Sequence, residues 1–151
     1  MRRMIILFFL GLLMMAAIAV GIGEACGLWG SFHAGVFNQI PGMALTVGGL
    51  ALIVWSVRSQ YTLGKGTPTP RVPTQRLVTQ GPYGYSRNPM TLGALLMYLG
   101  IGIWIGSGIV IILTLVVFIV LLRFIYIHET RELVERFGNE YVEYQQKTPF
   151  L

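Results

Sequence analysis

The chain has 151 residues, of which 54% are hydrophobic and only 11% are charged, and its formal net charge is +5. Soluble domains carry about 25% charged residues, so this composition excludes an ordinary soluble domain and indicates a membrane protein. The single cysteine, Cys26, excludes an internal disulfide and a multi-cysteine metal site. Because the chain has only two histidines and no aspartate, we expect it to bind no metal.

Four apolar stretches follow one another along the chain, and each is close to the roughly 17–25 residues that span a bilayer as a helix. They are Met4–Ile22, Ile40–Val57, Pro89–Ile105 and Ile109–Ile127. We therefore predict an all-α integral membrane protein with four transmembrane helices in a single membrane domain, residues 1–151. The first stretch could instead be a signal peptide, but it is longer than the usual apolar region of about 7–15 residues, which favours a retained helix.

The positions of the basic residues predict the orientation in the membrane. All 11 Lys and Arg lie at the N-terminus, in residues 58–88 or from Arg123 onward, and residues 23–39 and 106–108 have none. The positive-inside rule then places both termini and the 58–88 loop in the cytoplasm, which agrees with an even number of spans. We expect a multi-pass protein of a bacterial inner membrane. No separate basic domain is present, so nucleic acid is not an expected partner.

The first connection, Gly23–Gln39, is expected to be an outer loop whose aromatic residues suit the membrane interface. Pro41 fits the first turn of the helix that follows. After this second span, three prolines within Pro68–Pro73 predict extended chain.

A turn-forming stretch, GPYGYSRNPMTLG, comes directly before the third span. Pro89 begins that helix and leaves its first amides open, so the positive end of the helix dipole would attract a carboxylate. Tyr83 and Tyr85 offer flat faces for an aromatic base or a cation, and the glycines allow close approach to the backbone. S-adenosylmethionine would fit these features, because it has a carboxylate, a sulfonium cation and an adenine base. Several nucleotide-like ligands would fit them as well.

The third and fourth spans are joined only by Gly106-Ser107-Gly108, which predicts a tight antiparallel hairpin. Glycines recur along the third span and would allow neighbouring helices to approach closely.

After Arg123 the chain becomes polar, and apolar residues at helical spacing predict a cytoplasmic C-terminal amphipathic helix along the membrane surface. Arg131–Glu135 and Glu132–Arg136 are expected to form i,i+4 pairs. Gly138 is expected to end one helix and Asn139 to cap the next.

Two charged residues near the end of the fourth span are candidates for function. Glu129 lies at the predicted cytoplasmic mouth, where an ionisable group is costly unless it is paired or solvated. Arg123 lies deeper, and the alternative for this residue is an arginine that extends its charge to the interface without a further role.

The sequence GKGTPTPRVPTQRLVTQGPYGYSRNPM, followed after the hairpin by ETRELVERFGNEYVEYQQKTP, resembles the isoprenylcysteine carboxyl methyltransferase family and the related phospholipid methyltransferases. The resemblance covers about residues 61–150 in the family's order. It implies an integral membrane enzyme that takes a methyl group from S-adenosylmethionine, leaves S-adenosylhomocysteine, and acts on a lipid-tailed or apolar acceptor.

The resemblance also implies the site residues. Arg123 and Glu129 are the catalytic candidates, and the cofactor contacts fall on Gln75, Arg76, Leu77, Val78, Tyr83, Asn88, Pro89, Met90, Thr91 and Glu129. Asn88 replaces a frequent histidine, as in the RNPM variant of bacterial members. Thr130 replaces the second glutamate of a pair, and Ile125 stands where eukaryotic members have the substrate arginine. These departures argue against a prenylcysteine carboxylate as the substrate and do not affect the expected methyl donor.

The resemblance divides the chain into residues 1–58, the first two spans with their outer loop, and residues 59–151, the methyltransferase core. Two alternatives remain at this stage. One is a phospholipid or amine-lipid N-methyltransferase, and the other is a non-catalytic membrane scaffold of the same fold. A small transporter is disfavoured, because the spans contain few polar residues in their middle.

Overall fold

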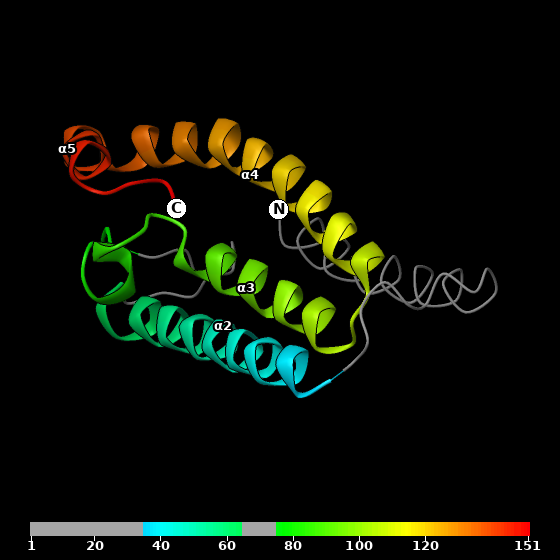
Figure 1. Cartoon of the computed structure of the whole chain (residues 1–151). Helices are drawn as coiled ribbons and strands as arrows, with labels where there is room; N and C mark the ends of the chain where they lie inside the picture. The colour runs from blue at the N-terminus through cyan, green and yellow to red at the C-terminus, as the bar shows by residue number, and fades with distance from the viewer. Residues whose placement is uncertain (1–34, 65–74) are drawn as a thin grey trace. The chain divides into compact units, whose positions relative to one another are not determined.

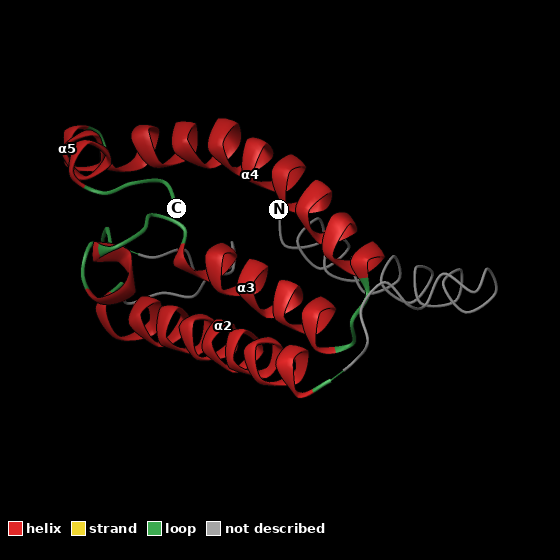
Figure 2. Ribbon diagram, viewed as in Figure 1, coloured by secondary structure: helices red, strands yellow, loops and turns green. Residues whose placement is uncertain are grey.

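The computed structural model describes residues 35–64 and 75–151, and within these ranges every regular element is helical (Figures 1 and 2). The elements in chain order are helix α2 (Val36–Leu63), the 3-10 turn η1 (Gly81–Gly84), and helices α3 (Pro89–Trp104), α4 (Gly108–Phe137) and α5 (Asn139–Lys147). The prediction of an all-α protein is confirmed for the described part of the chain. Three features of the sequence lie outside the described residues: the first predicted span (Met4–Ile22), Cys26, and the prolines of residues 68–73.

Helix α2 is longer than predicted at both ends. It begins at Val36, so residues 36–39 belong to the helix and not to the outer loop, and it runs on to Leu63. Pro41 consequently lies beyond the first turn, inside the helix, which corrects its predicted position. The hydroxyls of Thr46 and Ser56 donate to carbonyls four residues earlier, at 2.8 and 2.7 Å. These bonds satisfy polar groups that an apolar surrounding would otherwise leave without a partner.

Helices α3 and α4 form the predicted tight hairpin. Gly106 in the connection has a φ of 69°, a left-handed conformation that glycine adopts without strain. The Ser107 hydroxyl accepts a hydrogen bond from the Val110 amide at 3.3 Å and so caps the start of α4. Further into the hairpin, the rings of Tyr98 and Phe118 pack with their centroids 6.3 Å apart.

Helices α2 and α3 approach so closely that their glycines face backbone atoms. A Cβ atom added at Gly100 would lie 2.5 Å from the Thr46 nitrogen and 2.7 Å from the Gly42 oxygen. A Cβ at Gly42 would lie 2.6 Å from the Trp104 nitrogen. Real Cβ atoms do not come this close to backbone atoms, so glycine is required at both positions. The prediction that Gly100 permits close helix packing is confirmed.

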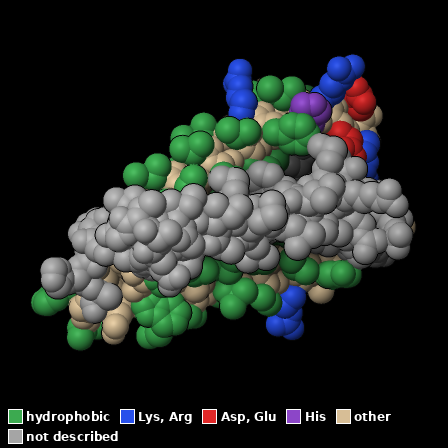
Figure 3. All heavy atoms as spheres, turned by 90° about the vertical axis from the view of Figure 1, so that its right-hand side faces the viewer, with side chains coloured by type: hydrophobic (Ala, Val, Ile, Leu, Met, Phe, Trp, Pro, Cys, Tyr) green, Lys and Arg blue, Asp and Glu red, His purple; other side chains and the backbone are tan. Residues whose placement is uncertain are grey.

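Two of the described helices are long and apolar enough to cross a bilayer. Helix α2 has 28 residues and α4 has 30, which at about 1.5 Å per residue exceeds a hydrocarbon core of about 30 Å. Helix α3, with 16 residues, is shorter. Large apolar side chains are exposed along both long helices, including Ile40, Val47, Val54, Ile112, Val116, Ile119 and Val120. Hydrophobic side chains accordingly dominate the described surface visible in Figure 3.

The chain forms two compact units, and each long helix contributes to both. One unit comprises Met1–Gly49 and Leu95–Phe118, and it contains the α2–α3 glycine contact and the turn of the hairpin. The other comprises Leu50–Ala94 and Ile119–Leu151, and it contains η1, the start of α3, the polar end of α4 and all of α5. The second unit therefore holds every predicted site residue.

The C-terminal helices agree in part with the prediction. Helix α4 continues to Phe137, and Gly138, with a φ of 55°, separates it from α5. Gly138 itself occupies the N-cap position of α5 and Asn139 is the first helical residue, so the predicted Asn139 cap is wrong. The ion pairs Arg131–Glu135, at 3.1 Å, and Arg136–Glu132, at 3.9 Å, are both present.

Candidate functional site

The turn η1 (GPYG) packs directly against the end of α2. Gly81 has a φ of 65°, and a Cβ atom there would lie 3.2 Å from the Ser59 hydroxyl and 3.7 Å from the Trp55 indole nitrogen. A glycine therefore meets two requirements at this position, the left-handed backbone and the close packing. The next two residues of the turn, Pro82 and Tyr83, are buried.

Tyr83 links η1 to two helices. The Gln60 side-chain amide donates to its hydroxyl at 2.6 Å, and the Tyr144 hydroxyl of α5 donates to its carbonyl at 2.6 Å. Burial and the neighbouring Tyr141 raise the pKa of the Tyr144 hydroxyl, while Arg87 lowers it. The net effect keeps Tyr144 protonated as a donor. These bonds tie the motif to α5, which is distant in sequence.

The C-terminal segment, Thr148–Leu151, runs back from α5 to the loop before α3 (Figure 1). The Arg87 amide donates to the Pro149 carbonyl at 3.0 Å, and the Ser86 hydroxyl donates to the Phe150 carbonyl at 3.3 Å. The Ser86 hydroxyl also accepts from the Asn88 amide at 3.0 Å. The segment therefore fixes the backbone of the SRN sequence at the entrance to α3.

The Phe150 side chain lies between this loop and α4. Its ring is 5.5 Å from the Arg87 guanidinium carbon, and it meets the Tyr126 ring edge-on, with the centroids 5.4 Å apart. Thr130 follows Tyr126 by one turn of α4, so the two residues share a helix face. The ring contacts link Arg87, Phe150 and Tyr126. We call these three residues, together with Thr130 one turn along α4, the Arg87 cluster.

The predicted donor-binding residues of the loop differ in burial. Gln75 and Arg76 are exposed, and Val78 and Pro89 are buried. The half-buried residues are Leu77, Asn88, Met90 and Thr91. The Gln75 amide donates to the Gly64 carbonyl at 2.9 Å, so this segment begins against the end of α2.

The start of α3 has the geometry that the sequence predicted. The first intrahelical bond runs from the Leu92 amide to the Asn88 carbonyl at 3.0 Å. The amides of Met90 and Thr91 therefore have no partner within the helix, and Pro89 has no amide proton. Asn88 also directs its side-chain nitrogen to the Phe150 carbonyl, at 3.5 Å.

The two catalytic candidates lie on the same continuous helix. Arg123 is exposed, and Glu129 belongs to the helical backbone of α4, with its side chain outside the described part. Six helical residues turn by about 240°, so the two positions are not on one face of α4. Glu129 is three residues after Tyr126, which places its backbone beside the Arg87 cluster.

Sequence reasoning missed Arg87, Phe150 and the hydroxyl of Thr130. Arg87 lies inside the GPYGYSRNP motif, but the sequence Arg-Asn-Pro does not reveal that the guanidinium group is partly buried. Phe150 lies more than 60 residues away, and only the folded chain brings it to the motif. Among the residues that the structure describes, no group of three or more His, Cys, Asp or Glu could hold a metal ion.

Comparison with known proteins identifies the family. The sequence profile described as phospholipid methyltransferase matches residues 37–140, which include η1, α3, α4 and all of α2 except its first residue. The chain belongs to the phospholipid methyltransferase family. No curated protein and no solved structure matches it.

Membership of the phospholipid methyltransferase family makes the protein a membrane methyltransferase, in agreement with its two long apolar helices. The match contains the GPYGYSRNP motif and Glu129, and it ends before the C-terminal segment that packs on that motif. The predicted family resemblance is confirmed.

Proposed function

We propose that the protein transfers a methyl group from S-adenosylmethionine to a lipid-tailed or apolar acceptor, in the manner of the isoprenylcysteine carboxyl methyltransferases. The family match over residues 37–140 carries this proposal. The apolar surfaces of α2 and α4 support an acceptor that reaches the site from the bilayer. A soluble acceptor would need a second polar cleft, for which the spans supply few side chains.

The residues of the second compact unit fit the donor chemically. The open amides of Met90 and Thr91 suit its carboxylate, and a glutamate at position 129 suits ribose hydroxyls or its amine. Tyr83 is buried and hydrogen-bonded, so in this proposal it contributes through the shape of the turn. The remaining proposed contacts are Gln75, Arg76, Leu77, Val78, Asn88 and Pro89.

When bound, S-adenosylmethionine supplies an electrophilic methyl group whose carbon–sulfur bonding pair stays on sulfur, so that S-adenosylhomocysteine remains. A carboxylate or thiolate acceptor needs no base for such a displacement, and an amine needs only to be deprotonated. The protein's tasks are then to align the acceptor and to exclude water. In this proposal Glu129 orients the donor, and Arg123 attracts an anionic head group.

A second candidate is an N-methyltransferase acting on a phospholipid or another amine lipid. The family's own description favours it. Ile125 stands where the resemblance to eukaryotic members would require a substrate arginine, which weakens the case for a prenylcysteine carboxylate. Both candidates share the donor and differ in the acceptor atom.

The acceptor is tested by incubating purified protein with methyl-labelled donor and either a lipid extract or the soluble metabolite fraction. We expect label in lipid-phase products only, because the apolar faces admit a tail and the donor site lies at the polar end of the helices. A lipid product labelled on nitrogen would select the second candidate, and label found only in soluble products would reject both.

The same assay tests Arg123. Arg123→Ala should reduce methylation of an anionic acceptor by about tenfold or more, because a hydrogen bond to a charged group contributes roughly 1.5–3 kcal/mol. The affinity for the methyl donor should be unchanged, because Arg123 is exposed and lies on a different face of α4 from position 129. Equal losses for anionic and neutral acceptors would remove Arg123 from acceptor recognition.

We also propose that the chain crosses the inner membrane of a bacterium four times, with both termini on the cytoplasmic side. Within the described residues, α2 has no Lys or Arg before Arg58, and α4 has none before Arg123, as the positive-inside rule requires for these ends. A membrane-impermeant thiol reagent added to intact cells should not label the Gly66→Cys variant in a Cys26→Ser background. Outside labelling at position 66 would contradict the proposed orientation, and labelling after the membrane is permeabilised controls for access.

A further inference from the structure

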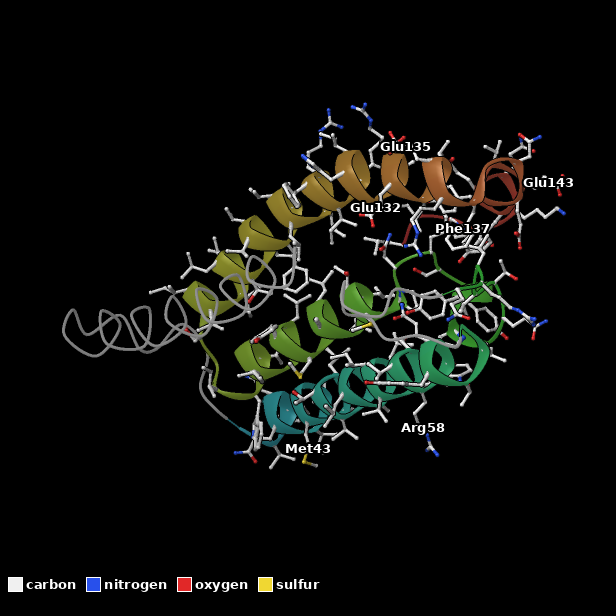
Figure 4. The ribbon with its side chains drawn as sticks, turned by 180° about the vertical axis from the view of Figure 1, so that it is seen from behind. Met43, Arg58, Glu132, Glu135, Phe137 and Glu143 are labelled. Atoms are coloured by element: carbon white, nitrogen blue, oxygen red, sulfur yellow. The ribbon has the colours of Figure 1, made fainter. Side chains whose placement is uncertain are left out.

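Arg87 has an arrangement that differs from that of other arginines in the described chain. Arg131 and Arg136 pair with glutamates on α4, and Arg58 points away from the end of α2 into the surroundings (Figure 4). Arg87 instead packs its guanidinium group over the Phe150 ring, 5.5 Å from the ring centroid. Its backbone is fixed at the same place by the bond to the Pro149 carbonyl.

Two guanidinium nitrogens of Arg87, Nε and Nη1, are buried and have no hydrogen-bond partner among the described residues. A guanidinium stays charged in proteins, and a buried charge without a partner is strongly unfavourable. Stacking on an aromatic ring offsets part of this cost but leaves the N–H donors unsatisfied. Native proteins rarely keep such donors unless a ligand, water or ion completes them.

A second unsatisfied group belongs to the same cluster. The Thr130 hydroxyl is buried and has no partner in the described chain. Thr130 is on the face of α4 that carries Tyr126, whose ring packs against Phe150. The guanidinium of Arg87 therefore stacks on Phe150, and the Thr130 hydroxyl lies one turn of α4 from Tyr126, which contacts the same ring. Arg87 as a whole is only half-buried, so part of the residue reaches the surface.

We propose that the Arg87 cluster binds an anionic oxygen group, a carboxylate or a phosphate, with Arg87 as its main donor and Thr130 as a second donor. This inference rests on the proposed function and adds a binding group that the motif did not indicate. Guanidinium groups recognise both anions through charge-assisted hydrogen bonds. In the proposed reaction the anion is the carboxylate of the methyl donor or the phosphate of a lipid head group.

The first measurement is the thermal unfolding of ligand-free protein in maltoside micelles, which contain no anionic group. Arg87→Met keeps an unbranched apolar stem against Phe150 and removes the charge. We expect its unfolding midpoint to equal or exceed that of the wild type, since it removes an unpartnered buried charge. Arg58→Met, at an exposed position, is the matched control. A large drop in the midpoint, or failure of Arg87→Met to fold without ligand, would show a structural arginine and overturn the proposal.

The second measurement identifies the source of the anion. For the donor carboxylate, Arg87→Met should weaken binding of S-adenosylmethionine by about tenfold or more while binding of decarboxylated S-adenosylmethionine stays unchanged. For a lipid phosphate, added phosphatidate should raise the unfolding midpoint of the wild type but not of Arg87→Met, and diacylglycerol should raise neither. Either pattern supports the proposal, and Arg58→Met should behave as the wild type in both.

The two hypotheses fail in different ways. If the wild type binds no S-adenosylmethionine, the proposed function fails, and the phosphatidate experiment still decides the role of Arg87. If the wild type prefers neither the carboxylate nor the phosphate ligand, or if Arg87→Met retains both preferences, the anion site is overturned whatever the enzyme's activity.

Discussion

Gly100→Ala should destabilise the protein by about 1–3 kcal/mol, the usual cost of forcing an extra group into a well-packed contact. The new Cβ atom would lie 2.5 Å from the Thr46 nitrogen and 2.7 Å from the Gly42 oxygen. Both are backbone atoms of α2, so no side chain can turn aside to make room. The helices must separate, and the packing along the contact is lost.

The control is Gly48→Ala on the same helix as Gly42. A Cβ atom at Gly48 would meet nothing within 4 Å, and alanine favours a helix over glycine by up to about 1 kcal/mol. Gly48→Ala should therefore be neutral or stabilising. Unfolding of both variants in one detergent, followed by helical circular dichroism, makes the comparison. Similar midpoints for the two variants would contradict the close α2–α3 contact.

The helices could be predicted because their signals are local. Long apolar runs and a three-residue glycine and serine turn placed the starts of α3 and α4 within one residue of those observed. The start of α2 was harder to place. Val36–Gln39 carry no strong initiation signal in their side chains, and Gly35 instead accepts hydrogen bonds from the Asn38 and Gln39 amides. Pro41 was consequently assigned to the first turn, whereas the helix begins five residues before it, at Val36.

The site could be predicted only where one segment carries it. The GPYGYSRNP motif and Glu129 became candidates from sequence alone, because their residue types and order resemble a known family. The burial of Arg87 and its contact with Phe150 depend on chain segments more than 60 residues apart, and no local pattern encodes them. For Tyr83, sequence alone indicated a role that differs from the contacts in the structure. Its ring suggested a stacking surface, whereas its hydroxyl and carbonyl hold α2 and α5 together.

The C-terminal segment gives the motif a support that the family match does not include. Residues 148–151 lie beyond the matched range 37–140, yet their carbonyls accept bonds from Ser86, Arg87 and Asn88. A loop that must present open amides and a charged side chain needs its backbone held by partners outside itself. The segment supplies these partners and places an aromatic ring beside α4, where Glu129 lies.

Glu129→Ala should weaken the binding of S-adenosylmethionine by about 1–3 kcal/mol, the usual cost of losing a charge-assisted hydrogen bond. This corresponds to roughly 5- to 150-fold in affinity. The position lies on α4 three residues after Tyr126, next to the Arg87 cluster, so its backbone is near the proposed anion site. Isothermal titration calorimetry of purified protein measures the change, and the unfolding midpoint confirms that the variant is folded.

Glu143→Ala is the matched control, because Glu143 is an exposed glutamate on α5 and its removal changes the net charge equally (Figure 4). We expect it to bind the donor as the wild type does. An S-adenosylhomocysteine analogue without ribose hydroxyls then tests the partner of Glu129: if the hydroxyls are the partner, the wild type and Glu129→Ala bind this analogue equally. Equal losses in Glu129→Ala and Glu143→Ala would indicate a long-range charge effect. Unchanged affinity in Glu129→Ala would remove Glu129 from the proposed donor site and leave the open amides of α3 and the Arg87 cluster as the remaining groups proposed to bind the donor.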